Sequence, residues 1–246
     1  MIYLLLQRNY LNLSISLIKM MLSFLTSLVF PNHCLLCEDL LRPEEQSVCQ
    51  LCLAAQPRCS FLERQRLERI SSTIEAQFSA VLINCPSVST LCHNLKYGGH
   101  PRMARHLGYH FLAPAIASAH IDIVLVPMPV SKRRRRRRGY NQSEGLAQGC
   151  LRKLTERGYR ATVALLLEKH AHRKSQIEVD PFERWTNPRG SLRVRQKIKQ
   201  RIPRDALLVL IDDTVTTGST LLYAAEVVRE VFPEQPLHLL ALALEV

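Results

Sequence analysis

The order of apolar runs and amphipathic stretches along the chain predicts alternating strands and helices. Two short runs rich in Val, Ile and Leu, at 121–126 and 207–211, are typical of strands that are buried on both faces. A turn and then a stretch with helical spacing of apolar residues follow each run, at 141–154 and 220–232. This alternation predicts an α/β fold with a parallel sheet flanked by helices, whose ligand sites lie at the carboxyl ends of the strands.

Further elements extend this pattern in both directions. The runs 78–83 and 237–244 predict two more strands, and apolar spacing across 90–112 predicts helices that break at Gly98, Gly99 and Pro101. Residues 60–76 are highly charged at their start, so we expect a linker or a solvated helix there. The α/β domain is therefore predicted to span residues 77–246.

The first thirty residues are apolar enough to suggest a signal peptide or a membrane span. Arg8 and Lys19 interrupt them, however, and no uncharged run reaches the length that a bilayer needs. From Met21 to Pro31 the apolar spacing predicts a helix. We expect an N-terminal helix within 1–30 and no transmembrane span, with a single membrane anchor as the alternative. Residues 1–20 are predicted to reflect an upstream start codon, or at least to lie outside the fold.

Four of the eight cysteines form two Cys-x-x-Cys pairs. Cys34 and Cys37 make up the first pair, and Cys49 and Cys52 make up the second. Two such turns can complete a closed tetrahedral shell around structural Zn²⁺, and a disulfide framework is the alternative. We expect a zinc ribbon over residues 31–59, with no open ligand position for catalysis.

The charge of the chain is concentrated in one place. The 246 residues are 47% hydrophobic and 22% charged, which is typical of globular proteins and argues against a disordered chain. The net charge is +12, and removing the seven charges of the run 132–138 leaves +5. A polyanion is therefore a reasonable partner for that run.

The segment 207–220 combines acids, hydroxyls and a glycine at the end of a predicted strand. Asp212 and Asp213 lie at the strand tip, and a turn that opens directly into a helix follows them. The N–H groups of such a turn and the helix dipole bind phosphate, whereas carboxylates suit neutral hydroxyls or Mg²⁺. A sugar phosphate would suit both groups, with its phosphate in the turn and its hydroxyls at the carboxylates. A capped helix preceded by solvated acids is the alternative. The predicted phosphate-binding residues are Thr216, Thr217, Gly218, Ser219 and Thr220.

Residues 211–220 resemble the motif that binds phosphoribosyl pyrophosphate (PRPP) in type I phosphoribosyltransferases. Within that class the chain resembles the ComF/GntX family, which comprises competence or DNA-utilisation proteins of bacteria. The resemblance covers about residues 21–246. Its motifs are Val126-Pro127-Met128-Pro129, Arg138-Gly139-Tyr140-Asn141-Gln142, Leu95-Lys96-Tyr97-Gly98, the ordered set Gln176, Arg184, Asn187 and Gly190, and the four-Cys ribbon.

The resemblance implies roles for individual residues. Asp212 and Asp213 would hold the ribose 2′- and 3′-hydroxyls and help to position Mg²⁺, while 216–220 would bind the 5′-phosphate. The turn that begins at Pro127 would bind pyrophosphate, with Arg138 complementing its charge. Residues 169–190 would form a hood that closes over the reaction centre. Pyrophosphate would leave C1′ of the ribose while an acceptor nitrogen adds.

The arginine run has two interpretations. It is either a solvated loop that improves solubility or a partner surface, because densely packed like charges repel one another. Arginine binds phosphate bidentately, and Tyr140 beside the run can stack on bases. Together with the family's link to DNA uptake, this predicts contact with single-stranded DNA. The residues concerned are Lys132, Arg133, Arg134, Arg135, Arg136, Arg137 and Tyr140.

Two functions from different classes fit these observations. The chain is either an enzyme that transfers ribose phosphate from PRPP to an acceptor, or an accessory protein of transformation that binds such a ligand without turnover. No segment resembles an element that would recognise a base acceptor. Competence or DNA-processing proteins are the expected partners, in the cytoplasm or at the inner face of the membrane.

Overall fold

The chain divides into two compact units in the computed structural model, which describes residues 32–43, 45–116, 122–169 and 192–245. Unit 1 ends at Ala54 and unit 2 begins at Ala55. Cys59, which we expected at the end of the ribbon, belongs to the core of unit 2, because its N–H bonds to Val81 O at 2.9 Å. The predicted helix within 1–30 and most of the hood lie outside the described residues.

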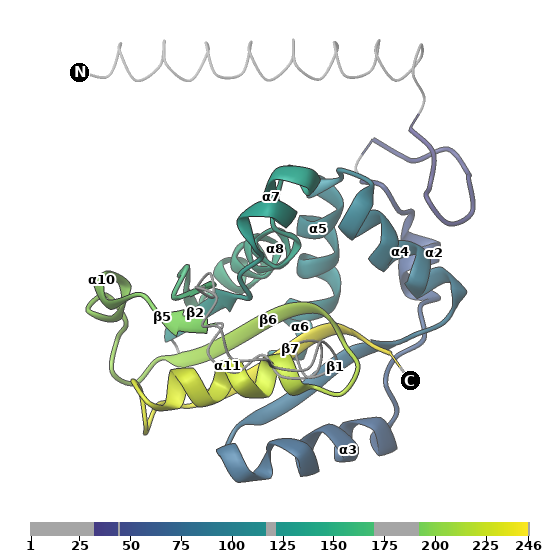
Figure 1. The fold of residues 1–246 in the computed structure, drawn as a ribbon. Helices are drawn as coiled ribbons and strands as arrows, with labels where there is room; N and C mark the ends of the chain where they lie inside the picture. The colour runs from purple at the N-terminus through teal and green to yellow at the C-terminus, as the bar shows by residue number, and fades with distance from the viewer. Residues whose placement is uncertain (1–31, 44, 117–121, 170–191, 246) are drawn as a thin grey trace, which may run out of the picture. The chain divides into compact units, whose positions relative to one another are not determined.

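Unit 2 is built on a five-stranded sheet in which every strand pairing is parallel (Figure 1). The predicted α/β fold is therefore confirmed. All eight residues of the last strand are buried, as a strand covered on both faces requires. The strand order is β1-β7-β6-β2-β3, with β1 Gln77–Ile83, β2 Asp122–Pro127, β3 Arg160–Val163, β6 Leu207–Val215 and β7 Leu237–Leu244.

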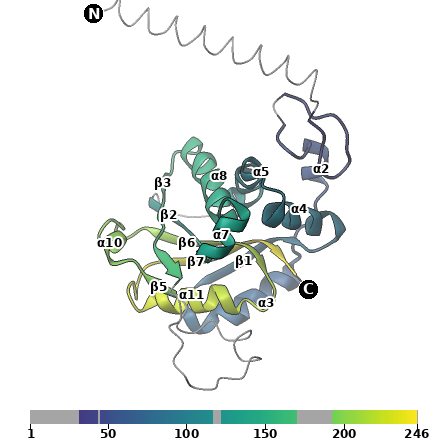
Figure 2. The same cartoon turned by 45° about the horizontal axis from the view of Figure 1, so that its top comes forward.

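Helices cover both faces of this sheet (Figures 1 and 2). On one face lie α3 Phe61–Ser71, the short turn η1 Ser72–Ile74 and α11 Ser219–Arg229. On the other face lie α4 Pro86–Tyr97, α5 Pro101–Leu107, η2 Gly108–Leu112, α6 Ala113–Ala115 and α8 Gln142–Glu156. The predicted helix break at 98–101 is confirmed, since α4 ends at Tyr97 and α5 begins at Pro101.

Smaller elements complete unit 2. A two-stranded antiparallel sheet pairs β4 Leu167–Lys169 with β5 Leu192–Val194, and α10 Gln196–Lys199 follows it. The apolar core beneath α3 and α11 includes Leu67, Phe78 and Leu221. Among the described residues, no helix combines the length and the apolar character needed to cross a bilayer.

The arginine run is a helix rather than the loop that the solubility interpretation assumed. It forms α7 Lys132–Arg138. The side chain of Ser131 caps its start by accepting from Arg134 N, and Gly139 ends it with a φ of 79°. Arg135 also forms a bidentate ion pair with Glu144 of α8, at 2.9 and 3.1 Å. These caps and this pair offset the repulsion between neighbouring guanidinium groups.

The connections of the sheet create a switch point between β2 and β6. From β2 the chain passes through α8 to β3, on one side, whereas from β6 it passes through α11 to β7, on the other side. Figure 1 shows α8 and α11 on opposite faces of the sheet. Open α/β sheets bind ligands in the crevice at such a point, outside the carboxyl ends of the strands.

The described part of unit 1, residues 32–43 and 45–54, contains little regular structure. Within it, His33 bridges to Leu40 and Gln46 bridges to Val48, and α2 Gln50–Ala54 follows. Within residues 32–54, Val48 and Leu53 are buried, but they supply too little apolar area for a stable core. A metal ion or another interaction would therefore add stability to this segment.

Candidate functional site

A cavity of about 370 Å³ lies at the switch point. Its wall includes Met128, Pro129 and Val130, which follow β2, together with Asp212 and Asp213 near the end of β6. The two strands are in register here, since Pro127 pairs with Ile211 and Met128 N donates to Ile211 O at 2.9 Å. The sheet thus places the turn after β2 beside the acid pair.

The two acids have different partners. Asp212 Oδ1 accepts from Ser143 Oγ at 3.1 Å and from Asp213 N at 2.9 Å. Burial, and after it the neighbouring charge of Asp213, raise the pKa of Asp212 from its ordinary value to about 7. Asp213 Oδ2 lies 3.7 Å from Lys96 Nζ, which donates to Thr214 Oγ1 at 3.0 Å. Near neutral pH, Asp212 can therefore exchange a proton or accept from a ligand hydroxyl.

The first turn of α8 forms a second wall of the cavity. The side chain of Asn141 caps this helix by accepting from Ser143 N at 3.1 Å. Its amide also donates to Met128 O at 2.9 Å and so fixes the turn after β2 against the helix. Gln142 and Ser143 line the cavity and are 1% and 2% exposed.

Only one of the predicted phosphate-binding residues lines the cavity. Thr220, in the first turn of α11, belongs to its wall. Thr216 and Thr217, in the turn before α11, and Ser219, the first residue of α11, are exposed, and Thr217 Oγ1 accepts from Ser219 N at 3.4 Å. The acid pair and Thr220 are therefore brought together, whereas 216–219 are not part of the cavity wall.

Gly218 meets two structural requirements that do not involve phosphate. Its φ of 79° lies in the left-handed region, and a Cβ there would approach the ring of Phe78 to 2.9 Å. The glycine therefore lets the chain turn closely over β1 into α11. The space beside Gly218 is thus occupied by an aromatic ring.

The cations of α7 fall into three groups. Arg134, Arg137 and Arg138 line the cavity, as helical spacing of three and four residues allows. Arg135 is held by Glu144. Lys132, Arg133 and Arg136 are exposed and do not line the cavity. The run is therefore not one uniform surface.

Two tyrosines lie beside these arginines in different environments. Tyr140 is partly buried, and its hydroxyl donates to Leu95 O at 2.6 Å. Burial raises its pKa to about 12, with a further contribution from the charge of Asp213. Tyr97 is 58% exposed, and the guanidinium carbons of Arg137 and Arg138 lie 5.9 and 5.5 Å from its ring centre. Tyr97 is therefore better placed than Tyr140 to stack on a base.

Pro127 and the hood complete the set of predicted positions. Pro127 is the last residue of β2 and is buried, so the cavity wall begins one residue later, at Met128. Lys169, at the end of β4, also lines the cavity. The remaining hood residues, 170–190, lie outside the described residues, and so do the four ordered residues of the resemblance within them.

The four predicted metal ligands of unit 1 form a cluster. The Sγ atoms of Cys34, Cys37, Cys49 and Cys52 all lie within 4.8 Å of one another, and the structure contains no disulfide among its eight cysteines. Cys37 Sγ and Cys49 Sγ are 3.8 Å apart, which matches the sulfur separation around a tetrahedral ion with metal–sulfur bonds of about 2.3 Å. Burial alone would raise the pKa of Cys34, but backbone N–H groups that donate to its sulfur lower it to about 7. The cluster can therefore hold a metal ion.

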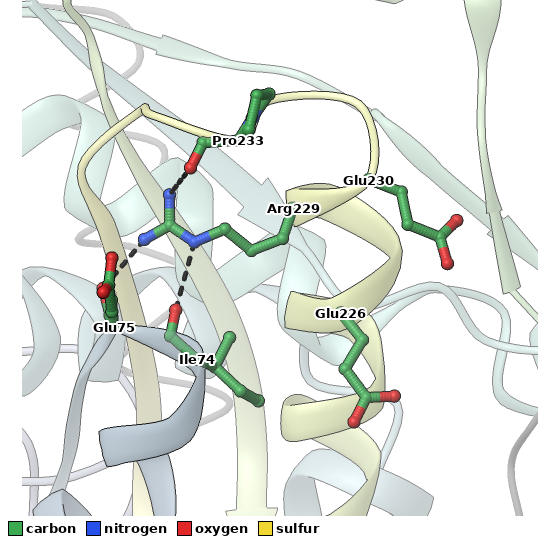
Figure 3. A pocket seen from close by; sticks show the side chains of 6 residues that line it. All are labelled: Ile74, Glu75, Glu226, Arg229, Glu230 and Pro233. Carbon is green, nitrogen blue, oxygen red and sulfur yellow. Dashed lines mark hydrogen bonds between the residues drawn. The ribbon is translucent and has the colours of Figure 1, made fainter.

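A second hollow in unit 2, of about 610 Å³, has a different character. Arg229 lies in its wall and donates to the main-chain carbonyls of Ile74, Glu75 and Pro233, at 2.8 to 3.1 Å (Figure 3). It also donates to Gln235 O at 2.6 Å. Glu226 and Glu230 point away from it in Figure 3. Main-chain carbonyls already accept from the guanidinium of Arg229. Arg229 is therefore not available to bind a ligand in this hollow.

Several residues of the cavity have no role predicted from the sequence, among them Lys96, Gln142 and Ser143. Lys96 reaches the other two only through the tertiary fold. A sequence signal was nevertheless present in α8, because Gln142 and Ser143 lie on the same helical stripe as Leu146, Ala147 and Cys150. Polar residues on an otherwise apolar stripe indicate either a buried hydrogen bond or a ligand.

Comparison with protein-family models finds no match to this chain, and comparison with curated proteins finds none of significance either. The function must therefore be argued from the site itself.

Proposed function

We propose that this chain is a phosphoribosyltransferase-fold protein that binds PRPP or a related ribose phosphate, and that it acts in the uptake or use of transforming single-stranded DNA. It would thus be a protein of the ComF/GntX type. One observation carries the proposal: at the switch point between β2 and β6, a single cavity contains an acid pair together with lysine and arginine side chains.

The chemistry of the cavity suits a sugar that carries charged groups. Asp212 and Asp213 accept hydrogen bonds from neutral hydroxyls such as those of ribose. Thr220 and the start of α11 would take the 5′-phosphate, because a helix N-terminus favours negative charge. Arg134, Arg137 and Arg138 would bind the pyrophosphoryl group on C1′ of the ribose. The volume of about 370 Å³ falls within the range of small-ligand sites.

The acid pair also fits Mg²⁺, which prefers carboxylate oxygens and phosphate oxygens from a substrate. Asp212 and Asp213 would hold the ion, which would neutralise pyrophosphate charge. The protein's own residues prepare this arrangement: Ser143 orients Asp212, and Lys96 holds Asp213. If the chain turns over, the arginines of α7 would stabilise the charge on the departing pyrophosphate.

The exposed part of α7 supports the nucleic-acid role. Lys132, Arg133 and Arg136 carry three positive charges that neither line the cavity nor pair with an acid among the described residues. Tyr97, next to α7, offers an exposed ring for stacking. These features suit a single strand that is bound through its phosphates and its bases.

The cysteine cluster would hold structural Zn²⁺. Four thiolates form a closed shell, so the ion would stabilise unit 1 and leave no position for a substrate. Unit 1 would then present a surface to a competence or DNA-processing protein. Eight free thiols suit a reducing compartment, which favours the cytoplasm or the inner face of the membrane.

Isothermal titration calorimetry with PRPP and Mg²⁺ tests the proposal. The unaltered protein should bind, and the double variant Asp212→Asn, Asp213→Asn should lose binding. Asp205→Asn is the matched control, because Asp205 is exposed just before β6, at the other end of the strand. Equal binding by all three proteins, or binding by none, would contradict the proposal. Release of pyrophosphate across a panel of bases then separates an enzyme from a binding protein.

A further inference from the structure

The cavity contains two buried donors that lack a partner among the described residues. Gln142 Nε2 and Arg138 Nε are both inaccessible to solvent and form no hydrogen bond. Both residues line the cavity. A buried donor without a partner destabilises a folded protein by about 1–3 kcal/mol, so it is retained where a ligand or water completes it.

Gln142 is the more informative of the two, because its side chain is almost fully enclosed. It is 1% exposed and occupies the first position of α8, where the helix dipole also favours negative charge. The neighbouring side chains are already engaged: Asn141 holds the turn after β2, and Ser143 holds Asp212. Gln142 is thus fixed in the wall while its amide donates to no group in the part of the chain that the structure describes.

Gln235 provides an internal comparison. It is also buried, at 7% exposure, but its Nε2 donates to Pro203 O at 2.7 Å and to Ala206 O at 3.4 Å. Gln235 therefore has a structural role, closing the loop before β6. The two glutamines share a side chain and a degree of burial, and they differ in whether the protein itself supplies acceptors.

We infer that Gln142 is a ligand-binding residue whose amide, together with Arg138 Nε, requires an unprotonated oxygen on the pyrophosphoryl end of the ligand. This rests on the proposed function and deepens it. An amide N–H and a guanidinium N–H both donate, so an ionised phosphoryl oxygen, which only accepts, satisfies them more strongly than a neutral hydroxyl oxygen does. Gln142 would thereby select ligands that carry a phosphoryl group at this end and disfavour ribose 5-phosphate.

The test uses Gln142→Met, which keeps the length of the side chain and removes the amide. Titration with inorganic pyrophosphate and Mg²⁺ should show affinity reduced about tenfold or more, while the midpoint of thermal unfolding without ligand stays unchanged or rises. Affinity for ribose 5-phosphate should not change. Gln142→Ala, which introduces no new packing, should weaken pyrophosphate binding in the same way.

Gln235→Met is the matched control. It should lower the midpoint of unfolding and leave pyrophosphate affinity unchanged, because it breaks two bonds to the main chain. The inference is overturned if Gln142→Met binds pyrophosphate as the unaltered protein does, or if it loses stability as Gln235→Met does. If the unaltered protein binds neither pyrophosphate nor PRPP, the proposed function fails along with it.

Discussion

The hollow beside Arg229 and the cavity between β2 and β6 both contain charged side chains, but these side chains have different partners. Arg229 donates to four main-chain carbonyls, so its charge belongs to the fold. In the cavity, Arg138 Nε and Gln142 Nε2 donate to no described group, and the partly buried Asp212 lies next to a second, buried acid, Asp213. The first hollow is the larger, at about 610 Å³ against 370 Å³.

This difference teaches that buried polar groups without a hydrogen-bond partner, rather than the volume of a hollow, identify a binding site. A polar group that the main chain satisfies stabilises the protein, whereas one that is buried without a partner destabilises it until a ligand arrives. Substitutions in the two regions should therefore have opposite effects on stability and on binding.

The largest expected effect concerns the cysteine cluster, where the missing partner would be a metal ion. Cys37→Ser should reduce zinc from one ion per chain to almost none and should speed proteolysis within 32–54, because unit 1 has little core of its own. Elemental analysis and limited proteolysis measure both effects. Cys85→Ser, at a partly exposed thiol of unit 2, is the control and should change neither. Zinc retained in Cys37→Ser would contradict the closed four-thiolate site.

The next largest effect concerns Arg229, whose guanidinium is hydrogen-bonded to the main chain. Arg229→Met should lower the free energy of unfolding by about 3 kcal/mol, because it leaves carbonyl groups without donors. For a domain of this size, the midpoint of thermal unfolding should fall by about 6–12 °C. Calorimetry should show unchanged PRPP affinity in the folded protein. A variant that lost affinity without losing stability would place a binding function in the hollow beside Arg229.

Replacing Asp212 should instead raise stability, by an amount that depends on pH. The pKa of Asp212 is about 7 in the folded protein and close to 3.8 when unfolded, so the folded state binds more protons between these values. The stability contributed by this group therefore falls as pH rises from about 4 to 7. Asp212→Asn should be more stable than the unaltered protein at pH 8, by at least about 1 kcal/mol or 2–4 °C, and the two should converge near pH 4. Thermal melts across this range measure the difference, and a constant difference would contradict the raised pKa.

The smallest effect concerns the exposed part of α7. Replacing Arg133 and Arg136 with Ala should weaken single-stranded DNA binding several-fold and reduce the log–log salt slope by about 1.4, at about 0.7 per phosphate. Arg201 and Arg204, both exposed in the loop before β6, provide a control with equal loss of charge. If the control pair lowers affinity by the same factor in a salt titration, the effect is net charge alone.

The strands were largely predictable from the sequence, because a strand buried on both faces leaves a continuous apolar run. The predicted strand at 237–244 matches β7 residue for residue. β6 continues four residues beyond its apolar run, since the acids still pair with β7, as in Asp212 with Ala241. β3 was missed because Arg160–Val163 is an edge strand with alternating exposure and no apolar run.

The candidate site was only partly predictable. Asp212 and Asp213 could be found because they directly follow a buried strand, and the four cysteines because of their spacing. The roles of Lys96 and Gln142 depend on α4 and α8 reaching the same strand end, which spacing along the chain does not specify. Only some cations of α7 line the cavity because residues 132–138 form a helix. The caps at Ser131 and Gly139 favour that helix.

A crystal structure determined with PRPP and Mg²⁺ would test the central claim most directly. It should place the ribose hydroxyls within hydrogen-bond distance of Asp212 and Asp213, and a pyrophosphoryl oxygen within that distance of Gln142 Nε2. An empty cavity under saturating ligand, or ligand bound in the hollow beside Arg229, would contradict the claim.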